Sequence, residues 1–276
     1  MNKLFLAPTT LPDTAAVEYI EAAAAAGFDG IGLRLNRSPG LPFYPVVGDA
    51  AATRAVRHAL VRTGLPVFDI LSFYLQAETD VASFKGALEL GAEIGARYVM
   101  VIGDDPEWRR LSGNFGRLCE MAARFNLACS LEFATQRRIG SLPDALRLIA
   151  EAGRPDTVLC LDFLHFARSG GKPEDLRSLD LKLLPYAQIT DGPLAPATSE
   201  MGAPGVIGTG LADRCMPGQG GVPIGDILDV LPAGLPLSVE VPPPPTLSVS
   251  AKDWAKTVSH GTRRFLEDYY RTKRRP

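Results

Sequence analysis

The sequence lacks several features that would place it in a specialised class of protein. No apolar run approaches the ~20 residues that a membrane-spanning helix requires, and residues 1–8 contain no apolar segment of signal-peptide length. Its four cysteines show no paired spacing, which excludes a disulfide framework. They lie mostly within apolar segments, so we expect reduced core thiols in a cytoplasmic protein: Cys119, Cys129, Cys160 and Cys215.

An excess of charge of one sign is also absent. The chain contains 29 Lys and Arg residues against 31 Asp and Glu residues, which gives a formal net charge of −2. A nucleic-acid-binding surface usually brings a basic excess. We therefore expect a small-molecule substrate, with neither nucleic acid nor a membrane as a partner, and the composition leaves a homo-oligomer open.

A glycine-rich phosphate-binding turn is missing as well. Such a turn normally follows the first strand of a doubly wound open sheet, whereas this chain has Ala7-Pro8-Thr9-Thr10 at that place. The composition, 46% apolar and 22% charged, is otherwise that of an ordinary globular protein. A length of 276 residues suits one large α/β domain.

What the sequence does contain is a repeated strand-then-helix pattern. Short apolar runs predict eight strands, and longer segments with capping residues predict helices between them. Eight such units match a closed (β/α)8 TIM barrel that occupies residues 1–276 as a single domain. The predicted strands are 4–7, 30–35, 67–71, 98–102, 128–133, 158–162, 186–191 and 236–241, and the predicted helices include 14–26, 49–63, 81–95, 106–125, 143–152 and 251–270.

The most informative stretch is the apolar run from Val158 to Leu161, which ends in Asp162. The run is typical of a strand that is buried on both faces. A carboxylate at the end of such a strand is costly unless it has a partner. A metal ion and a buried Arg or Lys are the two partners that would offset this cost.

Polar residues stand at the ends of four consecutive predicted strands. They are Glu132, Asp162, Gln188 and Glu240. Because a barrel brings the carboxyl ends of its strands to one face, we expect these side chains to converge. Carboxylates so close together would repel one another, and a divalent cation would relieve the repulsion. Their all-oxygen donor set predicts Mn²⁺ or Mg²⁺ as the bound metal ion.

These residues resemble the xylose-isomerase-like TIM barrels, a group of sugar phosphate isomerases and epimerases. Asp162 is followed three residues later by His165, Arg214 opens an Arg-x-x-Pro-Gly-x-Gly motif, and Glu240 ends the last strand. The resemblance implies a divalent-metal-dependent isomerase or epimerase that acts on a sugar or a related polyhydroxy carbonyl compound through an enediolate. It also implies that Glu132 and Glu240 transfer the proton while His165 and Arg214 hold substrate oxygens.

One position departs from the pattern of this family. Gln188 stands where most members have His, and members that dehydrate 3-dehydroshikimate are similar in carrying Gln there. The alternative is therefore a metal-dependent dehydratase of a cyclic hydroxy-ketone such as 3-dehydroshikimate or an inosose. A DNA-cleaving branch of the same fold needs several histidines for three zinc ions. This branch is disfavoured here because His58 and His260 fall within predicted helices.

The segment from Gly192 to Gly221 is rich in glycine and proline. A loop of this length inside a compact domain is usually functional, so we expect 192–221 to form a lid that brings Arg214 over the substrate. Asp191 is expected to orient Gln188 or to pair with Lys182. Further candidates for the pocket wall, at the exits of other strands, are Arg34, Tyr74 and Trp108.

Overall fold

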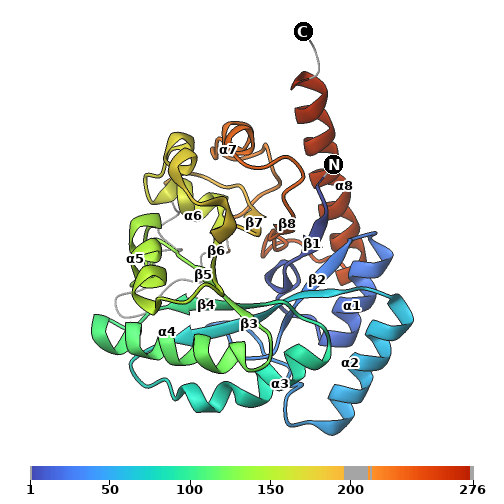
Figure 1. Ribbon diagram of the computed structural model, residues 1–276. Coiled ribbons are helices and arrows are strands. Elements are labelled where there is room, and N and C mark those ends of the chain that lie inside the picture. Colours follow the sequence, from blue (N-terminus) through green and yellow to red (C-terminus); the bar gives the residue numbers. More distant parts are fainter. Residues whose placement is uncertain (1, 196–210, 212, 274–276) are drawn as a thin grey trace.

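The computed structural model describes residues 2–195, 211 and 213–273. These residues form eight parallel strands, each paired with the next, and β8 pairs with β1 to close the barrel (Figure 1). The (β/α)8 fold expected from the sequence is thereby confirmed. The strands are β1 (Leu4–Leu6), β2 (Gly30–Arg34), β3 (Val67–Leu75), β4 (Tyr98–Gly103), β5 (Ala128–Glu132), β6 (Thr157–Asp162), β7 (Tyr186–Ile189) and β8 (Leu237–Val239).

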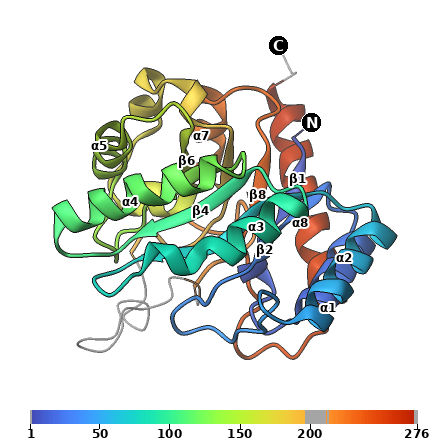
Figure 2. The same ribbon diagram turned by 60° about the horizontal axis from the view of Figure 1, so that its bottom comes forward.

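Helices surround the barrel, as both views show (Figure 1, Figure 2). The first and the last of them pack against each other, so the ring of helices closes beside the junction of β1 and β8. Tyr270 of the last helix also donates a hydrogen bond of 2.7 Å to the side chain of Asn2. The α-helices are α1 (Ala16–Ala25), α2 (Ala50–Thr63), α3 (Lys85–Glu93), α4 (Trp108–Ala123), α5 (Leu142–Ala152), α6 (Phe163–Arg168), α7 (Ile224–Val230) and α8 (Ala251–Lys273).

Local signals explain where several elements begin and end. The Asp49 side chain accepts hydrogen bonds of 2.8 and 2.9 Å from two amides in the first turn of α2, and Gly64 ends that helix with a φ of 69°. Strand β3 continues to Leu75, beyond the end predicted at residue 71, because this extension pairs with β4 as far as Gly103. The sequence pattern did not give the bounds of the short helices α6 and α7.

The lower half of the barrel interior is filled by aromatic side chains. Phe5, Phe68, Tyr98 and Tyr186 form one cluster together with Cys160. The ring centroids of Phe5 and Phe68 lie 4.4 Å apart, and those of Phe68 and Tyr186 lie 4.8 Å apart with perpendicular rings. Phe68, Tyr98 and Tyr186 lie at or next to the amino ends of their strands, so the polar residues at the carboxyl ends sit above a packed floor.

Two further sequence expectations concern membrane-spanning helices and the predicted lid. Among the described residues, no helix combines the length and the apolar character needed to cross a membrane. The predicted lid, 192–221, includes residues 196–210 and 212, which lie outside the described residues. Its final part, 213–221, is described and carries Arg214.

Candidate active site

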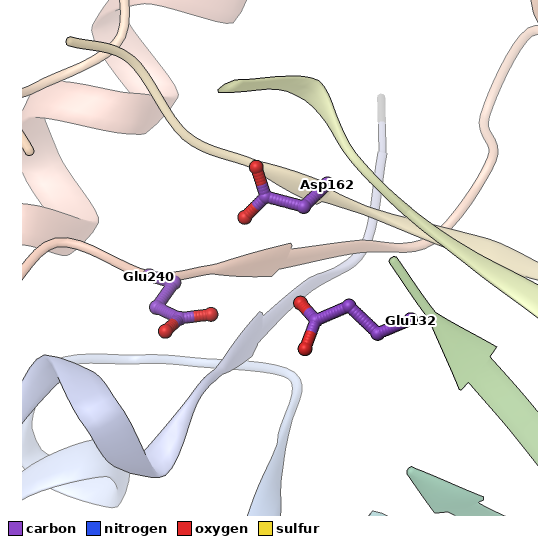
Figure 3. Close-up of side chains that lie close together, drawn as sticks. All are labelled: Glu132, Asp162 and Glu240. Atoms are coloured by element: carbon purple, nitrogen blue, oxygen red, sulfur yellow. The ribbon is translucent and has the colours of Figure 1, made fainter. Parts of the chain in front are cut away.

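Three carboxylates meet at the carboxyl end of the barrel. Glu132 ends β5, Asp162 ends β6 and Glu240 directly follows β8. Each of the three offers an oxygen, and these oxygens all lie within 4.8 Å of one another. Figure 3 shows the three carboxylates pointing toward one shared space from separate strands. All three residues are buried, so the group could hold a metal ion.

The carboxylate of Asp162 is held from two sides. Its Oδ1 accepts a hydrogen bond of 2.9 Å from the amide of His165 and one of 2.8 Å from the hydroxyl of Thr190. Through the first of these bonds Asp162 is the N-cap residue of α6. The strand end and the helix start therefore fix this carboxylate together.

Arg214 brings a guanidinium group into the same space. Its Nη1 donates to Oδ2 of Asp162 at 2.8 Å and lies 3.9 Å from Oε2 of Glu240, and its side chain is only 2% exposed. Of the two partners that the sequence suggested for Asp162, the buried arginine is thus present. Its single positive charge faces a cluster of three carboxylates.

The charges of this cluster are unevenly balanced. Burial, followed by the nearby carboxylates of Glu240 and Asp162, raises the pKa of Glu132 well above its ordinary value. Burial would also raise the pKa of Asp162, but Arg214 and His165 lower it to about 2. One guanidinium therefore keeps one carboxylate ionised, and the cluster still lacks positive charge.

Gln188 lies within the same group of strands. It pairs in register with Asp162 on β6 and with Ser238 on β8, two residues before Glu240. Since neighbouring residues of parallel strands face the same side, its amide points into the barrel. Neither the oxygen nor the nitrogen of this fully buried amide has a hydrogen-bond partner in the described part of the chain. An unpaired buried amide is costly, so the observation fits a site that supplies an oxygen ligand to a cation.

His165 contributes an imidazole that is neutral near pH 7, because burial lowers its pKa to about 4. Its Nε2 lies 3.1 Å from Nη2 of Arg214, which can only donate. The proton of the neutral ring is therefore assigned to Nδ1, which is buried and has no partner among the described residues. The imidazole can thus donate a hydrogen bond to an oxygen of a bound molecule.

Asp191 has neither of the two roles that the sequence suggested. No hydrogen bond joins it to Gln188, and Lys182 is exposed whereas Asp191 is fully buried. Its carboxylate instead accepts four backbone hydrogen bonds of 2.8–3.1 Å from the amides of Gly192, Gly218, Gly220 and Val222. Because it also pairs with Cys215 through the backbone, Asp191 anchors the segment that carries Arg214.

An open cavity of about 580 Å³ lies above these residues. Glu132, Glu240, His165 and Arg214 line it, whereas Asp162 and Gln188 do not and lie beneath it. Its wall combines polar groups with apolar contacts, as small-molecule sites do. Other lining residues include Thr9, Ser38, Ser72, Tyr74, Met100, Ile102, Gln136 and Arg137.

The structure also places the three further candidates for the pocket wall, Arg34, Tyr74 and Trp108. Tyr74 lines the cavity, as expected. Arg34 lines a separate, smaller cavity beside Tyr44. Trp108 lies at the start of α4, where its ring stacks with outer-surface arginines instead of facing the site. His58 and His260 are exposed on α2 and α8, as predicted from their helical segments.

Sequence reasoning missed Arg137, which follows β5 and lines the cavity beside Glu132. Arg137 and Arg138 are adjacent, and the sequence offered no signal to tell which of them faces inward. Only the position of Arg137, five residues after a strand-end glutamate in a predicted barrel, could have suggested it.

Comparisons with curated proteins identify two relatives. The 3-dehydroshikimate dehydratase of Pseudomonas putida KT2440 is 27% identical over 245 residues, covering 81% of this chain and 35% of the relative. The enzyme of the same name from Pseudomonas aeruginosa PAO1 is 28% identical over 242 residues, covering 81% and 36%. The chain therefore spans about a third of the length of these relatives.

Three solved structures share the fold with this chain over nearly the whole length of both chains. The IolI protein with a bound zinc atom has a TM-score of 0.75 at 19% identity, covering 97% of this chain and 99% of that one. The probable 3-dehydroshikimate dehydratase AsbF of Bacillus anthracis has a TM-score of 0.72 at 16% identity, covering 94% and 97%. A D-allulose 3-epimerase from Methylomonas sp. has a TM-score of 0.67 at 17% identity, covering 97% and 98%.

These likenesses between structures establish a common fold and no shared reaction, because the identities are low. The assignment to a family rests on the sequence. The family model described as xylose isomerase-like TIM barrel matches residues 20–258, which include the three carboxylates, Gln188, His165 and Arg214. This chain therefore belongs to the xylose isomerase-like TIM barrel family.

Proposed function

We propose that this chain is a divalent-metal-dependent dehydratase of a cyclic hydroxy-ketone of the 3-dehydroshikimate type. The observation that carries the proposal is Gln188, a buried amide without a partner in the described residues, which lies beside Asp162 in register. The two curated relatives, both 3-dehydroshikimate dehydratases, support this reaction over the epimerase expected first from the sequence.

The residues proposed to hold the metal ion are Glu132, Asp162, Gln188 and Glu240. They supply oxygen atoms alone, a donor set that suits Mn²⁺ or Mg²⁺ better than softer ions. The neutral amide adds a ligand without adding a fourth negative charge. When bound, the ion supplies positive charge beside the carbonyl oxygen of the substrate and so favours loss of a proton from the adjacent carbon.

Glu132 and Glu240 are the residues proposed to move that proton. Both line the cavity, whereas the carboxylate of Asp162 is taken up by its own hydrogen bonds and by Arg214. A base must reach the proton that it removes, so these two glutamates are the candidates of the cluster. His165 and Arg214 both line the cavity and are the residues proposed to hold substrate oxygens.

The reaction itself is an elimination of water followed by aromatisation. A glutamate removes the proton on the carbon between the ketone and the next hydroxyl-bearing carbon, and the electron pair of that C–H bond forms a C=C bond. The C–O bond of the β-hydroxyl breaks, and the hydroxide leaves as water with a proton from a second acid. Loss of one ring proton and protonation of the ketone oxygen then give the catechol ring of protocatechuate. The net change is the loss of one water molecule.

Incubation of the Mn²⁺-loaded protein with 3-dehydroshikimate tests this proposal. The expected result is growth of protocatechuate absorbance that stops when a chelator removes the ion and that is reduced by at least about 100-fold in Glu132→Gln. Epimerase activity, the second candidate, is tested by incubating the same preparation with ketohexoses and separating the products by chromatography. Epimerised sugar without protocatechuate would replace the dehydratase proposal by the epimerase.

A further inference from the structure

The wall of the cavity carries a second arginine, Arg137. This residue lies in the loop after β5, lines the same cavity as Glu132, and has a side chain that is only 5% exposed. Its pairing with Asp104 accounts for its burial. The proposed chemistry gives its guanidinium no role toward the substrate.

The guanidinium of Arg137 is held in place from one edge and one face. Its Nη1 donates to Oδ2 of Asp104 at 2.9 Å, and its carbon centre lies 5.3 Å from the ring centroid of Tyr74. Asp104 is itself fixed by the amide of Arg138 at 3.4 Å and by the side-chain amide of Gln76 at 3.5 Å. The planar group thus has a preset orientation before any ligand arrives.

This arrangement uses only part of what the guanidinium can donate. An arginine has five N–H donors, and within the described part of the chain only Nη1 of Arg137 has a hydrogen-bond acceptor. The remaining donors are not sealed off, because no nitrogen of this residue is among the buried atoms without a partner. They are therefore open to the cavity that Arg137 lines.

The cavity wall combines acidic and basic side chains. Glu132 and Glu240 line it as proposed metal ligands, and Arg214 lines it with its guanidinium paired to Asp162. Arg137 stands in the wall as the other lining arginine, with an unused planar fork of donors. Such a fork matches a carboxylate, which it binds through two parallel hydrogen bonds.

We propose that Arg137 binds a carboxylate group of the substrate and so selects acidic ring ketones over neutral sugars. This inference rests on the proposed function, since it names the acidic group that a substrate of that reaction carries. The substrate would then span the cavity, with its ketone and hydroxyl at the carboxylate cluster and its acid at Arg137. Asp104 acts as a positioning residue, because it touches the guanidinium and does not line the cavity.

The adjacent Arg138 provides a matched control. It carries the same charge one residue later, is exposed, and stacks over Trp108 at 5.1 Å from the ring centroid. It does not line the cavity. Comparison of Arg137→Met with Arg138→Met therefore separates a defined subsite from a general effect of positive charge.

The test uses protocatechuate and catechol, which share a metal-binding diol and differ only in the carboxylate. Their affinities for the Mn²⁺-loaded full chain are measured by calorimetry. We expect wild type to bind protocatechuate more tightly, and Arg137→Met to lose about 30-fold in affinity for protocatechuate while affinity for catechol changes less than about twofold. Arg138→Met should change neither affinity, and Arg137→Lys should retain an intermediate preference.

Turnover provides a second measurement. With 3-dehydroshikimate, Arg137→Met should raise KM far more than it lowers kcat, because a remote binding contact is lost. If Arg137→Met weakens both ligands equally, or if wild type binds them equally, the subsite is refuted even where 3-dehydroshikimate is turned over. If wild type shows no turnover but prefers protocatechuate through Arg137, the subsite stands and the proposed reaction falls.

Discussion

Nη1 of Arg214 lies 2.8 Å from Oδ2 of Asp162, and both side chains are almost completely buried. This contact makes an arginine from the segment after β7 the immediate partner of the carboxylate that ends β6. Since one guanidinium faces three clustered carboxylates, it stabilises the site without neutralising it. Substitutions of Arg214 and Gln188 alter this balance of charge or the set of metal ligands.

Removal of Arg214 should destabilise the metal-free protein. Arg214→Met leaves Asp162 as an uncompensated buried charge, which should lower the free energy of unfolding by about 3 kcal/mol. Urea denaturation of chelator-treated protein measures this loss. In the double variant with Asp162→Asn, which keeps the cap of α6, the two losses should be less than additive. Strict additivity would mean that the ion pair contributes nothing.

Gln188→His should shift the preference for metal ions. The amide oxygen of Gln188 is a hard ligand, whereas imidazole also suits Co²⁺ and Zn²⁺. Thermal melting of wild type and variant is compared across Mg²⁺, Mn²⁺, Co²⁺ and Zn²⁺, and we expect the stabilisation by Zn²⁺ to rise relative to that by Mg²⁺. Gln188→Glu should fold less stably without metal, because it adds a negative charge beside the carboxylates. An identical order of ions in wild type and Gln188→His would show that position 188 supplies no ligand.

Asp191→Ala should release the segment that carries Arg214. The variant leaves four backbone amides without the acceptor that they share, which should cost about 2–4 kcal/mol of unfolding free energy. Activity should fall to the level of Arg214→Met, since the guanidinium loses its anchor. Asp180→Ala is the control, because the exposed Asp180 caps one short turn through the amide of Lys182. Equal effects of the two substitutions would contradict the anchoring role.

Asp69 should make stability depend on pH. Burial raises its pKa from 3.8 to about 7, although the hydroxyl of Tyr186 donates to it at 3.2 Å. The folded state then binds the proton more tightly than the unfolded state, so this stabilisation is complete below about pH 4 and is lost as pH rises through 7. Asp69→Asn, which keeps an acceptor for Tyr186, should remove that loss.

The measurement for Asp69 is the unfolding free energy of wild type and Asp69→Asn in chelator at pH 5 and at pH 8. Between these two pH values the difference should move in favour of the variant by about 2–3 kcal/mol. Groups distant from Asp69 are common to both proteins and cancel, whereas the pKa of buried Glu132, which the Asp69 charge raises, is lower in the variant. Parallel pH profiles would show that Asp69 is ionised in the folded protein throughout this range.

The strand ends could be predicted from the sequence because each is marked locally. A buried run that stops at Glu132 or Asp162 carries its own signal, and the barrel fold then brings such ends together without any knowledge of pairing. The predicted set also contained Gln188, which the register places beside Asp162. Its role as a ligand stays a prediction.

The arginines could not be assigned in this way. Arg137 depends on Asp104, 33 residues earlier, and on a backbone turn between Ala134 and Ile139 that directs one of two adjacent arginines inward. The role of Asp191 depends on the folding back of residues 218–222 onto the end of β7. Both are contacts between distant segments, and no local periodicity encodes them.

The hydrogen bonds of Asp162 bear on how related sequences should be compared. Because this side chain starts α6 and also binds Arg214, it would still stabilise a descendant that had lost all catalysis. Asp162→Glu would move the carboxylate away from the first turn of α6, and Asp162→Asn would remove the charge that pairs with Arg214. Gln188 has no such structural duty among the described residues. Position 188, which carries Gln here and His in most members of the family, is thus the one whose replacement by an apolar residue should mark an inactive member.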